Sequence, residues 1–331
     1  MLDLTAFSTP RESTQGGAPR PAPRVALGAM NFGKRTPADE AERIMARAVE
    51  RGVTLIDTAN MYVDGASEEI VGRFVKARRD RVLVATKVGL FGFLRGKAEG
   101  LSKVAVLAAA DQSLARLGTD RIDLYYLHAP DHRTPIEDTL SGVAELLEKG
   151  KIRAFGVSNY ASWQILEIFH HCDAHGMPRP VIAQQIYNLF IRQLDIEYAR
   201  FARKYRLHTT VYNALAGGML SGRYRQDRTI EPGSRFDKNR LYLGRYWNDR
   251  VFELIEAYGA LAGQAGLSLL DMAYSWLAGA PVVDSILVGP ASVAHLDGAL
   301  DALQKVLPDE IRSEVDAIHR AFQGTDTTYA R

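Results

Sequence analysis

The stretch VLVATK, Val82 to Lys87, decides the fold, because it opens with four apolar residues in succession and ends on a charged one. Such continuous apolar content is typical of a strand that is covered on both faces, as in a parallel sheet. Seven further runs of this kind occur along the chain: VALG from Val25, TLID to Asp57, DLYYLH to His128, AFGVS to Ser158, VIAQQ to Gln185, HTTVY to Tyr212 and SILVG to Gly289. The sequence therefore predicts eight parallel strands.

Helical patterns separate these runs. Apolar residues recur at helical spacing over residues 136–147, and Gly150 supplies the stop. Thr36, Pro37 and Asp39 are typical of a helix start, with Thr36 as the cap. Alternating strands and helices predict βα units and a parallel sheet.

The alternation is regular as far as Tyr212 and then fails. A long polar loop, residues 216–248, is predicted there, followed by two helices. Because no interior linker interrupts the eight strands, we predict one α/β domain, a (β/α)8 TIM barrel over residues 24–331, rather than two domains. Residues 1–23, rich in Pro and Gly, are predicted to form a flexible arm, with a short cap against the core as the alternative.

Composition excludes several classes of partner. Lys and Arg number 41 and Asp and Glu 39, so the net charge of +2 offers no general attraction for nucleic acid or an acidic membrane. The longest apolar run, VAVLAAA at residues 104–110, is far shorter than the roughly 18 residues that a membrane span needs. The single cysteine, Cys172, excludes an internal disulfide and fits a reducing compartment, so we expect a cytoplasmic protein.

Four chemically active side chains lie at or near predicted strand ends. Asp57, Lys87 and His128 each end a predicted strand, and Tyr62 follows Asp57 by five residues. The C-terminal strand ends of a (β/α)8 barrel meet on one face, where active sites lie. Each residue alone has a structural interpretation, as a helix cap, a solvated strand end, a core histidine or a packing tyrosine. The four together favour a catalytic group.

The four residue types suit acid catalysis on a carbonyl group. A tyrosine hydroxyl has an ordinary pKa near 10, and a nearby ammonium lowers it by favouring the phenolate. We therefore expect Lys87 to lower the pKa of Tyr62 and make it a better acid. Asp57 would hold Lys87 in place and charged, and His128 would hydrogen-bond a substrate carbonyl oxygen.

Seven segments carry a resemblance to a known family: LGAMNFG, IDTANMY, ATKVG, LHAPDH, GVSNY, NALAGGMLSGRY and RYW, which run in family order. The chain resembles the aldo-keto reductases, and is most similar to their aflatoxin-aldehyde reductase branch. The resemblance implies a (β/α)8 barrel that reduces aldehydes or ketones with NADPH by direct hydride transfer. It also implies Tyr62 as the proton donor, tuned by Lys87 and Asp57, with His128 orienting the carbonyl.

The expected cofactor site is not a Rossmann site, because GAMNFG, Gly28 to Gly33, lacks the G-x-G-x-x-G spacing. The resemblance implies that Ser158, Asn159 and Gln184 bind the nicotinamide carboxamide and that Tyr212 stacks on the ring. Further cofactor contacts are implied in the glycine-rich segment that would approach the pyrophosphate: Asn213, Leu215, Gly217, Gly218, Gly222 and Arg223.

The segment GPASVAHLDGA, Gly289 to Ala299, matches the family's site for the adenosine phosphate. It implies Gly289, Ser292 and His295 as contacts, since a helix N-terminus there favours phosphate. Ala291, His295 and Ala299 depart from the serine, the glutamine or arginine, and the asparagine of the family. We predict NADPH (NADP+) as the cofactor, with NADH as the alternative.

The expected partner is a small carbonyl substrate, held by the long loop. Tyr242 and Arg245 match residues that hold a substrate carboxylate in the resembling branch, and a planar guanidinium suits that contact. An ordinary surface arginine is the structural alternative for Arg245, because three other arginines lie nearby. The residues expected to shape the pocket are Met30, Ala129 and Trp247. Assembly into a homo-oligomer is compatible with this interpretation.

Two other functions compete with this one. The groups HHCDAH, with His171, Cys172 and His175, and HAPDH, residues 128–132, raise a metal-dependent barrel hydrolase as an alternative. The first group ends a helix away from the catalytic face, and the first two strands lack an H-x-H pair, so we predict no metal site. Similar barrels also serve as cofactor-binding regulatory subunits of membrane channels, which would turn over slowly.

Overall fold

The computed structural model describes residues 23–90, 99–224 and 229–324. Eight parallel strands form one closed barrel in chain order, and β1 pairs with both β2 and β8. The strands are β1 (Arg24–Gly28), β2 (Leu55–Asp57), β3 (Leu83–Val88), β4 (Ile122–Leu127), β5 (Ile152–Ser158), β6 (Ile182–Ile186), β7 (His208–Tyr212) and β8 (Ser285–Val288). The predicted eight strands and (β/α)8 fold are confirmed. The predicted arm falls on residues outside the described ranges, apart from Pro23.

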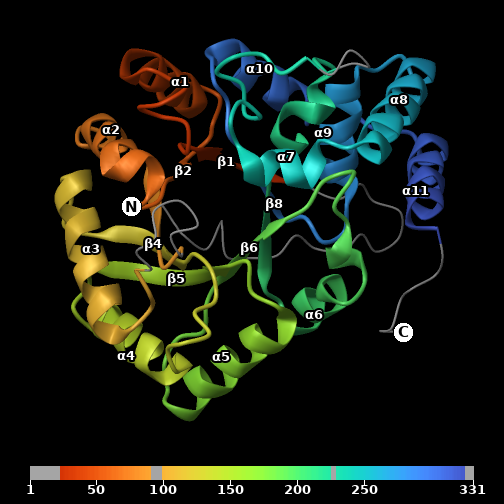
Figure 1. The fold of residues 1–331 in the computed structure, drawn as a ribbon. Helices are drawn as coiled ribbons and strands as arrows, with labels where there is room; N and C mark the ends of the chain where they lie inside the picture. The colour runs from red at the N-terminus through yellow and green to blue at the C-terminus, as the bar shows by residue number, and fades with distance from the viewer. Residues whose placement is uncertain (1–22, 91–98, 225–228, 325–331) are drawn as a thin grey trace.

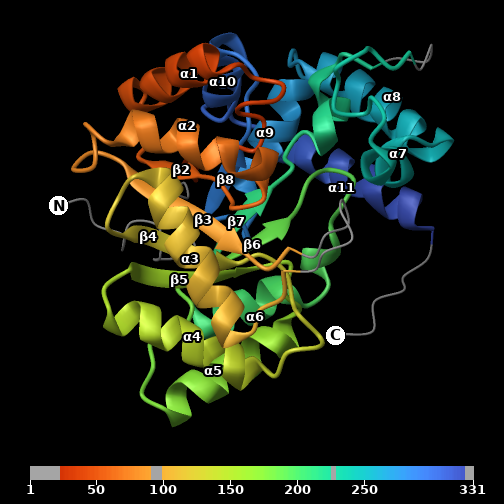
Figure 2. The same ribbon diagram turned by 60° about the vertical axis from the view of Figure 1, so that its left-hand side comes forward.

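Helices surround the strands, as Figure 1 shows. They are α1 (Ala38–Glu50), α2 (Ala66–Val75), α3 (Lys103–Leu117), α4 (Ile136–Glu148), α5 (Ser162–Ala174), α6 (Tyr198–Tyr205), α7 (Arg240–Tyr246), α8 (Asp249–Gln264), α9 (Leu269–Gly279), α10 (Val293–Ala302) and α11 (Asp309–Gln323), with 3-10 turns η2 (Tyr62–Gly65), η3 (Gln193–Asp195) and η4 (Ala216–Ser221). Helices α1 and α10 lie side by side (Figure 2). They are joined by Arg47 of α1 and by Arg51, the residue that follows α1, which both bind Asp297. The predicted stop at Gly150 is confirmed: α4 ends just before it, and Gly150 has a φ of 67°.

Because side chains alternate between the two faces of a strand, the predicted catalytic residues point into the barrel. Leu83 and Ala85 belong to the small apolar cluster that fills the barrel, and so do Leu124 and Tyr126 of the next strand. Side chains two residues apart on a strand share a face. Lys87, two residues after Ala85, therefore points inward at the C-terminal end, and Asp57 and His128 follow the same rule after Leu55 and Tyr126.

Two local predictions are wrong. Thr36 does not cap α1: Pro37 is the N-cap without a side-chain hydrogen bond, and the Thr36 side chain is fully buried, with Oγ1 lacking a partner within the described residues. Tertiary burial has overridden the local capping preference. The segment 216–248 is not one irregular loop, because it contains η4 and α7; the Asn239 side chain caps α7 by accepting from the Tyr242 N–H at 3.4 Å.

The two helices predicted after that segment are α8 and α9, and they are confirmed. Across the described ranges, no helix combines the length and the apolar character needed to cross a membrane.

Candidate active site

A buried ion pair lies at the C-terminal mouth of the barrel. The Lys87 ammonium is 0% exposed and donates to Asp57 Oδ1 and, at 2.7 Å, to the Thr58 carbonyl oxygen. Gln184 Nε2 donates to the other carboxylate oxygen of Asp57 at 3.0 Å. Burial lowers the pKa of Lys87, and the Asp57 carboxylate opposes that shift by favouring the ammonium. Asp57 ends β2 as predicted, whereas Val88 follows Lys87 on β3 and β4 ends one residue before His128.

Tyr62 completes the group from the loop after β2. Its ring centroid lies 5.2 Å from Lys87 Nζ and 5.8 Å from that of His128, with the two rings nearly perpendicular. Burial, followed by the charge of Asp57, raises the pKa of the Tyr62 hydroxyl well above its ordinary value. The expectation that Lys87 lowers this pKa is therefore wrong for the protein alone, because burial of the hydroxyl and the charge of Asp57 both raise it. Tyr62 keeps its proton throughout the neutral range.

His128 is a neutral imidazole. It is 6% exposed, and burial, followed by the charge of Lys87, lowers its pKa well below 6.5. Its backbone is held on both sides, since its N–H donates to the Val88 carbonyl at 2.8 Å and its own carbonyl accepts from Asn159 Nδ2 at 2.9 Å. Nδ1 has no partner among the described residues. Such a histidine can donate a hydrogen bond to a carbonyl oxygen without carrying charge.

The predicted carboxamide residues form one network beside this group. Ser158 Oγ donates to the Gln184 carbonyl at 2.9 Å, and Asn159 Nδ2 donates to Ser158 Oγ at 3.1 Å. The Tyr212 hydroxyl donates to Asn159 Oδ1 at 2.7 Å. Gln184 joins the network to Asp57. The four residues are therefore adjacent to one another and to the catalytic group, as a nicotinamide site requires.

In the glycine-rich segment after β7, the backbone adopts conformations that residues other than glycine rarely tolerate. Gly217, Gly218 and Gly222 have φ values of 72°, 107° and 79°, and Asn213 Oδ1 accepts from the Gly217 N–H at 2.8 Å. A Cβ at Gly217 would lie 2.7 Å from the Tyr242 ring. Glycine is the residue that tolerates such a backbone and lets it approach a ligand closely.

The two predicted phosphate-binding segments interact through charge. Burial lowers the pKa of His295, and the charge of Arg223 lowers it further. Ser292 caps α10 by accepting from the His295 N–H at 3.2 Å. A basic side chain, a helix N-terminus and a glycine backbone fit the phosphates of a dinucleotide. Ala299 is buried at 2% exposure and offers no polar contact there.

Tyr242, a predicted substrate residue, packs against Gly217 of the glycine-rich segment, and one further residue contacts its ring. Arg245 is exposed, with its guanidinium 6.0 Å from the Tyr246 ring centroid. Arg235, not predicted as a site residue, donates to Asn31 Oδ1 at 2.9 Å and lies 5.3 Å over the Tyr242 ring. Its charge opposes the raised pKa of Tyr62, which burial dominates. No local sequence signal separates Arg235 from the other arginines of this loop.

The remaining predicted substrate residues differ in exposure. Met30 is 37% exposed, and Ala129 and Trp247 are partly buried.

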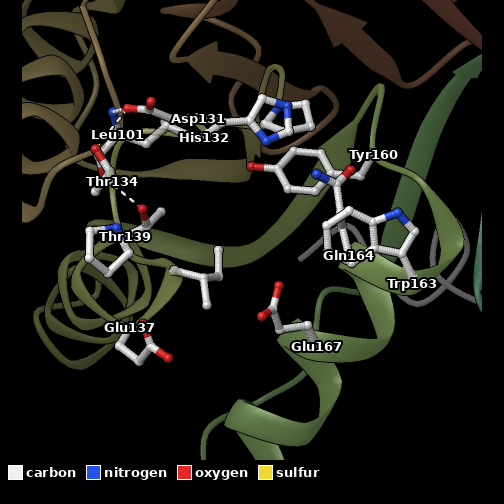
Figure 3. A pocket seen from close by; sticks show the side chains of 13 residues that line it. Leu101, Asp131, His132, Thr134, Glu137, Thr139, Tyr160, Trp163, Gln164 and Glu167 are labelled. Atoms are coloured by element: carbon white, nitrogen blue, oxygen red, sulfur yellow. Dashed lines mark hydrogen bonds between the residues drawn. The ribbon is translucent and has the colours of Figure 1, made fainter.

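The residues of the metal hypothesis do not converge. His128 lies in the barrel mouth, whereas Asp131 and His132 line a recess of about 300 Å³ outside it, between the loop after β4 and the start of α5 (Figure 3). Asp131 accepts from the Leu101 N–H at 2.9 Å and from Thr134 Oγ1 at 2.7 Å. His171 and His175 stack at the end of α5. Within the described ranges, no group of three or more His, Cys, Asp or Glu side chains has the arrangement to hold a metal ion.

A closed parallel barrel with a protonated tyrosine, a buried Lys–Asp pair and a neutral histidine at its C-terminal face defines an oxidoreductase that acts on carbonyl or alcohol groups. The sequence model of the aldo/keto reductase family matches residues 24–320, and the chain belongs to that family. Enzymes of this family use nicotinamide cofactors.

The chain is also similar to individual proteins. The human protein aflatoxin B1 aldehyde reductase member 2 is 37% identical over 305 residues, which cover 86% of this chain and 83% of that protein. A probable voltage-gated potassium channel subunit beta from Arabidopsis thaliana is 28% identical over 300 residues, covering 89% of this chain and 90% of that protein. A solved glycerol dehydrogenase from Gluconobacter oxydans matches with a TM-score of 0.77 at 29% identity, over 98% of this chain and 99% of that one.

Proposed function

We propose that the protein reduces aldehydes or ketones to alcohols with NADPH, with Tyr62 as the general acid. The observation that carries the proposal is the convergence of Tyr62 and His128 on the buried Lys87–Asp57 pair. NADPH, when bound, supplies a hydride to the carbonyl carbon. The carbonyl oxygen takes the proton of the Tyr62 hydroxyl, so that an alcohol and a tyrosinate result.

Each of the other three residues has a part in that proton transfer. Neutral His128 donates a hydrogen bond to the carbonyl oxygen and so orients the substrate. The Lys87 ammonium stabilises the tyrosinate once the proton has left, and Asp57 keeps Lys87 charged and in place. The raised pKa of Tyr62 is compatible with this role, because an alkoxide is a far stronger base than a tyrosinate.

For the cofactor, Ser158, Asn159 and Gln184 would hold the carboxamide, and the segment from Asn213 to Arg223 would hold the pyrophosphate. The basic side chain of Arg223 and the N-terminus of α10, capped by Ser292, support NADPH over NADH, because both suit an additional phosphate. The buried Ala299 removes one family contact to adenine, which keeps NADH as the alternative. For the location we propose the cytoplasm, where the free thiol of Cys172 would stay reduced.

The proposal is tested by following NADPH and NADH consumption by the purified protein. The panel contains succinic semialdehyde, nitrobenzaldehyde, a diketone and a sugar aldehyde. We expect turnover with at least one carbonyl compound and a higher kcat/KM with NADPH. Tight NADPH binding without turnover on any substrate would favour the second candidate, a regulatory subunit. The similarity to the Arabidopsis channel subunit is the observation behind that candidate.

Two arginines are predicted to set the preference for charged substrates. Arg235→Ala is expected to raise KM for succinic semialdehyde roughly 10-fold or more, because a hydrogen bond to a charged group contributes about 1.5–3 kcal/mol. Arg245→Ala should raise it less, since that guanidinium is exposed. Neither substitution should raise KM for the uncharged nitrobenzaldehyde by a comparable factor. Arg240→Ala, at the exposed first residue of α7, is the control; equal effects on both substrates would contradict the prediction.

A further inference from the structure

The catalytic tyrosine is followed by a strained turn. Val63, Asp64 and Gly65 all have left-handed backbones, with φ values of 50°, 55° and 93°. A β-branched residue such as valine rarely adopts this conformation, because its side chain collides with the backbone. Such strain persists where the surrounding structure holds the backbone in place. The position of Tyr62 therefore depends on contacts made outside the turn.

The chain before Tyr62 is fixed to β3, the strand that carries Lys87. The Thr58 N–H donates to the Ala85 carbonyl at 2.9 Å, and the Asn60 N–H donates to the Lys87 carbonyl at 3.2 Å. Glu99 reinforces this contact, since it accepts from Asn60 Nδ2 and from the Gly89 N–H. These hydrogen bonds fix the position of the backbone relative to Lys87 as far as Asn60, two residues before the tyrosine.

The chain after Tyr62 is fixed by a buried carboxylate. Glu68, in the first turn of α2, is 0% exposed; it accepts from Thr86 Oγ1 at 2.5 Å and from Arg116 Nε at 2.6 Å. Thr86 directly precedes Lys87 on β3. The side chain of Arg116 covers Gly65 so closely that a Cβ there would lie 2.7 Å from Arg116 Cδ. Glu68 thereby links the turn, the strand of Lys87 and helix α3.

We propose that Glu68 and Arg116 form a positioning clamp, acting through Gly65, that sets the Tyr62 hydroxyl relative to Lys87. The inference rests on the proposed role of Tyr62 as proton donor. Neither clamp residue touches the reacting atoms. A buried carboxylate loses its hydration and is tolerated only when its partners compensate for that loss. Moving the Glu68 carboxylate away from Thr86 and Arg116 would therefore cost free energy. The clamp explains why a strained turn stays in one conformation directly after the acid.

The first test compares two glycines that both have positive φ. Gly65→Ala adds a Cβ against Arg116 and should displace the turn, whereas Gly118→Ala, at a φ of 61° with open space around it, strains the backbone at the end of α3 only. We expect Gly65→Ala to lower kcat at least 10-fold per folded protein, since a misplacement of about 1 Å can cost roughly 100-fold. The Kd for NADPH should stay within about two-fold. Gly118→Ala should leave kcat within about two-fold.

The second test removes the charge of the clamp. Glu68→Gln should lower kcat and increase the solvent deuterium isotope effect on kcat, because proton transfer from Tyr62 becomes slower. Glu69→Gln, exposed at the next position of α2, is the matched control and should change neither. Ultraviolet titration of the protein without cofactor gives an independent measurement. The difference between each variant and its Tyr62→Phe counterpart reports the Tyr62 pKa, which should move towards its ordinary value when the clamp is lost.

The outcomes separate the clamp from the proposed function. If Gly65→Ala and Glu68→Gln match their controls in kcat and in the Tyr62 titration, the clamp is wrong even when Tyr62→Phe is inactive. If Tyr62→Phe keeps full activity, the proposed function is wrong, and the titration still decides whether the clamp positions the tyrosine. A loss of kcat that is fully explained by a smaller folded fraction would also overturn the clamp.

Discussion

Tyr62→Phe is expected to lower kcat roughly 10²–10⁴-fold, the range that a positioned general acid contributes. The substitution removes the hydroxyl and keeps the ring against His128 and Lys87, so the Kd for NADPH should change by less than about two-fold. Tyr125→Phe is the matched control, since that buried hydroxyl donates to the Val106 carbonyl outside the barrel mouth. Loss of NADPH binding with unchanged turnover per bound cofactor would contradict the assignment of Tyr62.

The pH dependence of kcat/KM gives a second measurement of the same residue, because it reports groups in the free enzyme. Reduction needs protonated Tyr62, whose pKa burial raises well above 10. It also needs neutral His128, whose pKa burial and Lys87 lower well below 6.5. Activity should therefore be lost only above the raised pKa of Tyr62 and below the lowered pKa of His128. A decline between pH 7 and 9 that Tyr62 governs would contradict the structure.

The sequence predicts the inward placement of the candidate catalytic residues, because that placement is local. On a strand covered on both faces, continuous apolar content marks the strand, and alternation then sends Asp57, Lys87 and His128 to one interior end. The contacts of Glu68 and Arg235 could not be predicted in this way. Glu68 meets Thr86 and Arg116, which lie 18 and 48 residues away, and Arg235 meets Asn31 across 204 residues. Neither contact leaves a pattern in the neighbouring sequence.

Two of the three failed predictions have a related cause. The cap at Thr36 was predicted from local preference, but tertiary packing buries that side chain. The lowered pKa of Tyr62 was predicted from one pair of charges, Lys87 and Tyr62. The structure adds the desolvation of the site and the nearby Asp57, and both of these raise the pKa of Tyr62. Local rules therefore place the catalytic group, but the pKa values depend on everything that surrounds it.

Substitutions in the Lys87–Asp57 pair are expected to affect stability and activity differently. Lys87→Met leaves the Asp57 carboxylate buried with Gln184 as its one side-chain donor among the residues that the structure describes, which should lower the free energy of unfolding by about 3–5 kcal/mol. The double variant Asp57→Asn with Lys87→Met leaves no unpaired charge, so it should regain most of that loss. Urea denaturation measures both. Lys149→Met, which breaks an exposed pair with Glu145 on α4, should cost less than about 1 kcal/mol.

Activity should not follow the recovered stability. Without the ammonium nothing stabilises the tyrosinate that forms as Tyr62 gives up its proton, so both variants should lose roughly 10²–10³-fold in kcat, as when one electrostatic contact to a transition state is removed. The two measurements together test the pair. If the double variant were no more stable than Lys87→Met, the carboxylate would not be the source of the instability; if it regained activity, the ammonium would have no part in the proton transfer.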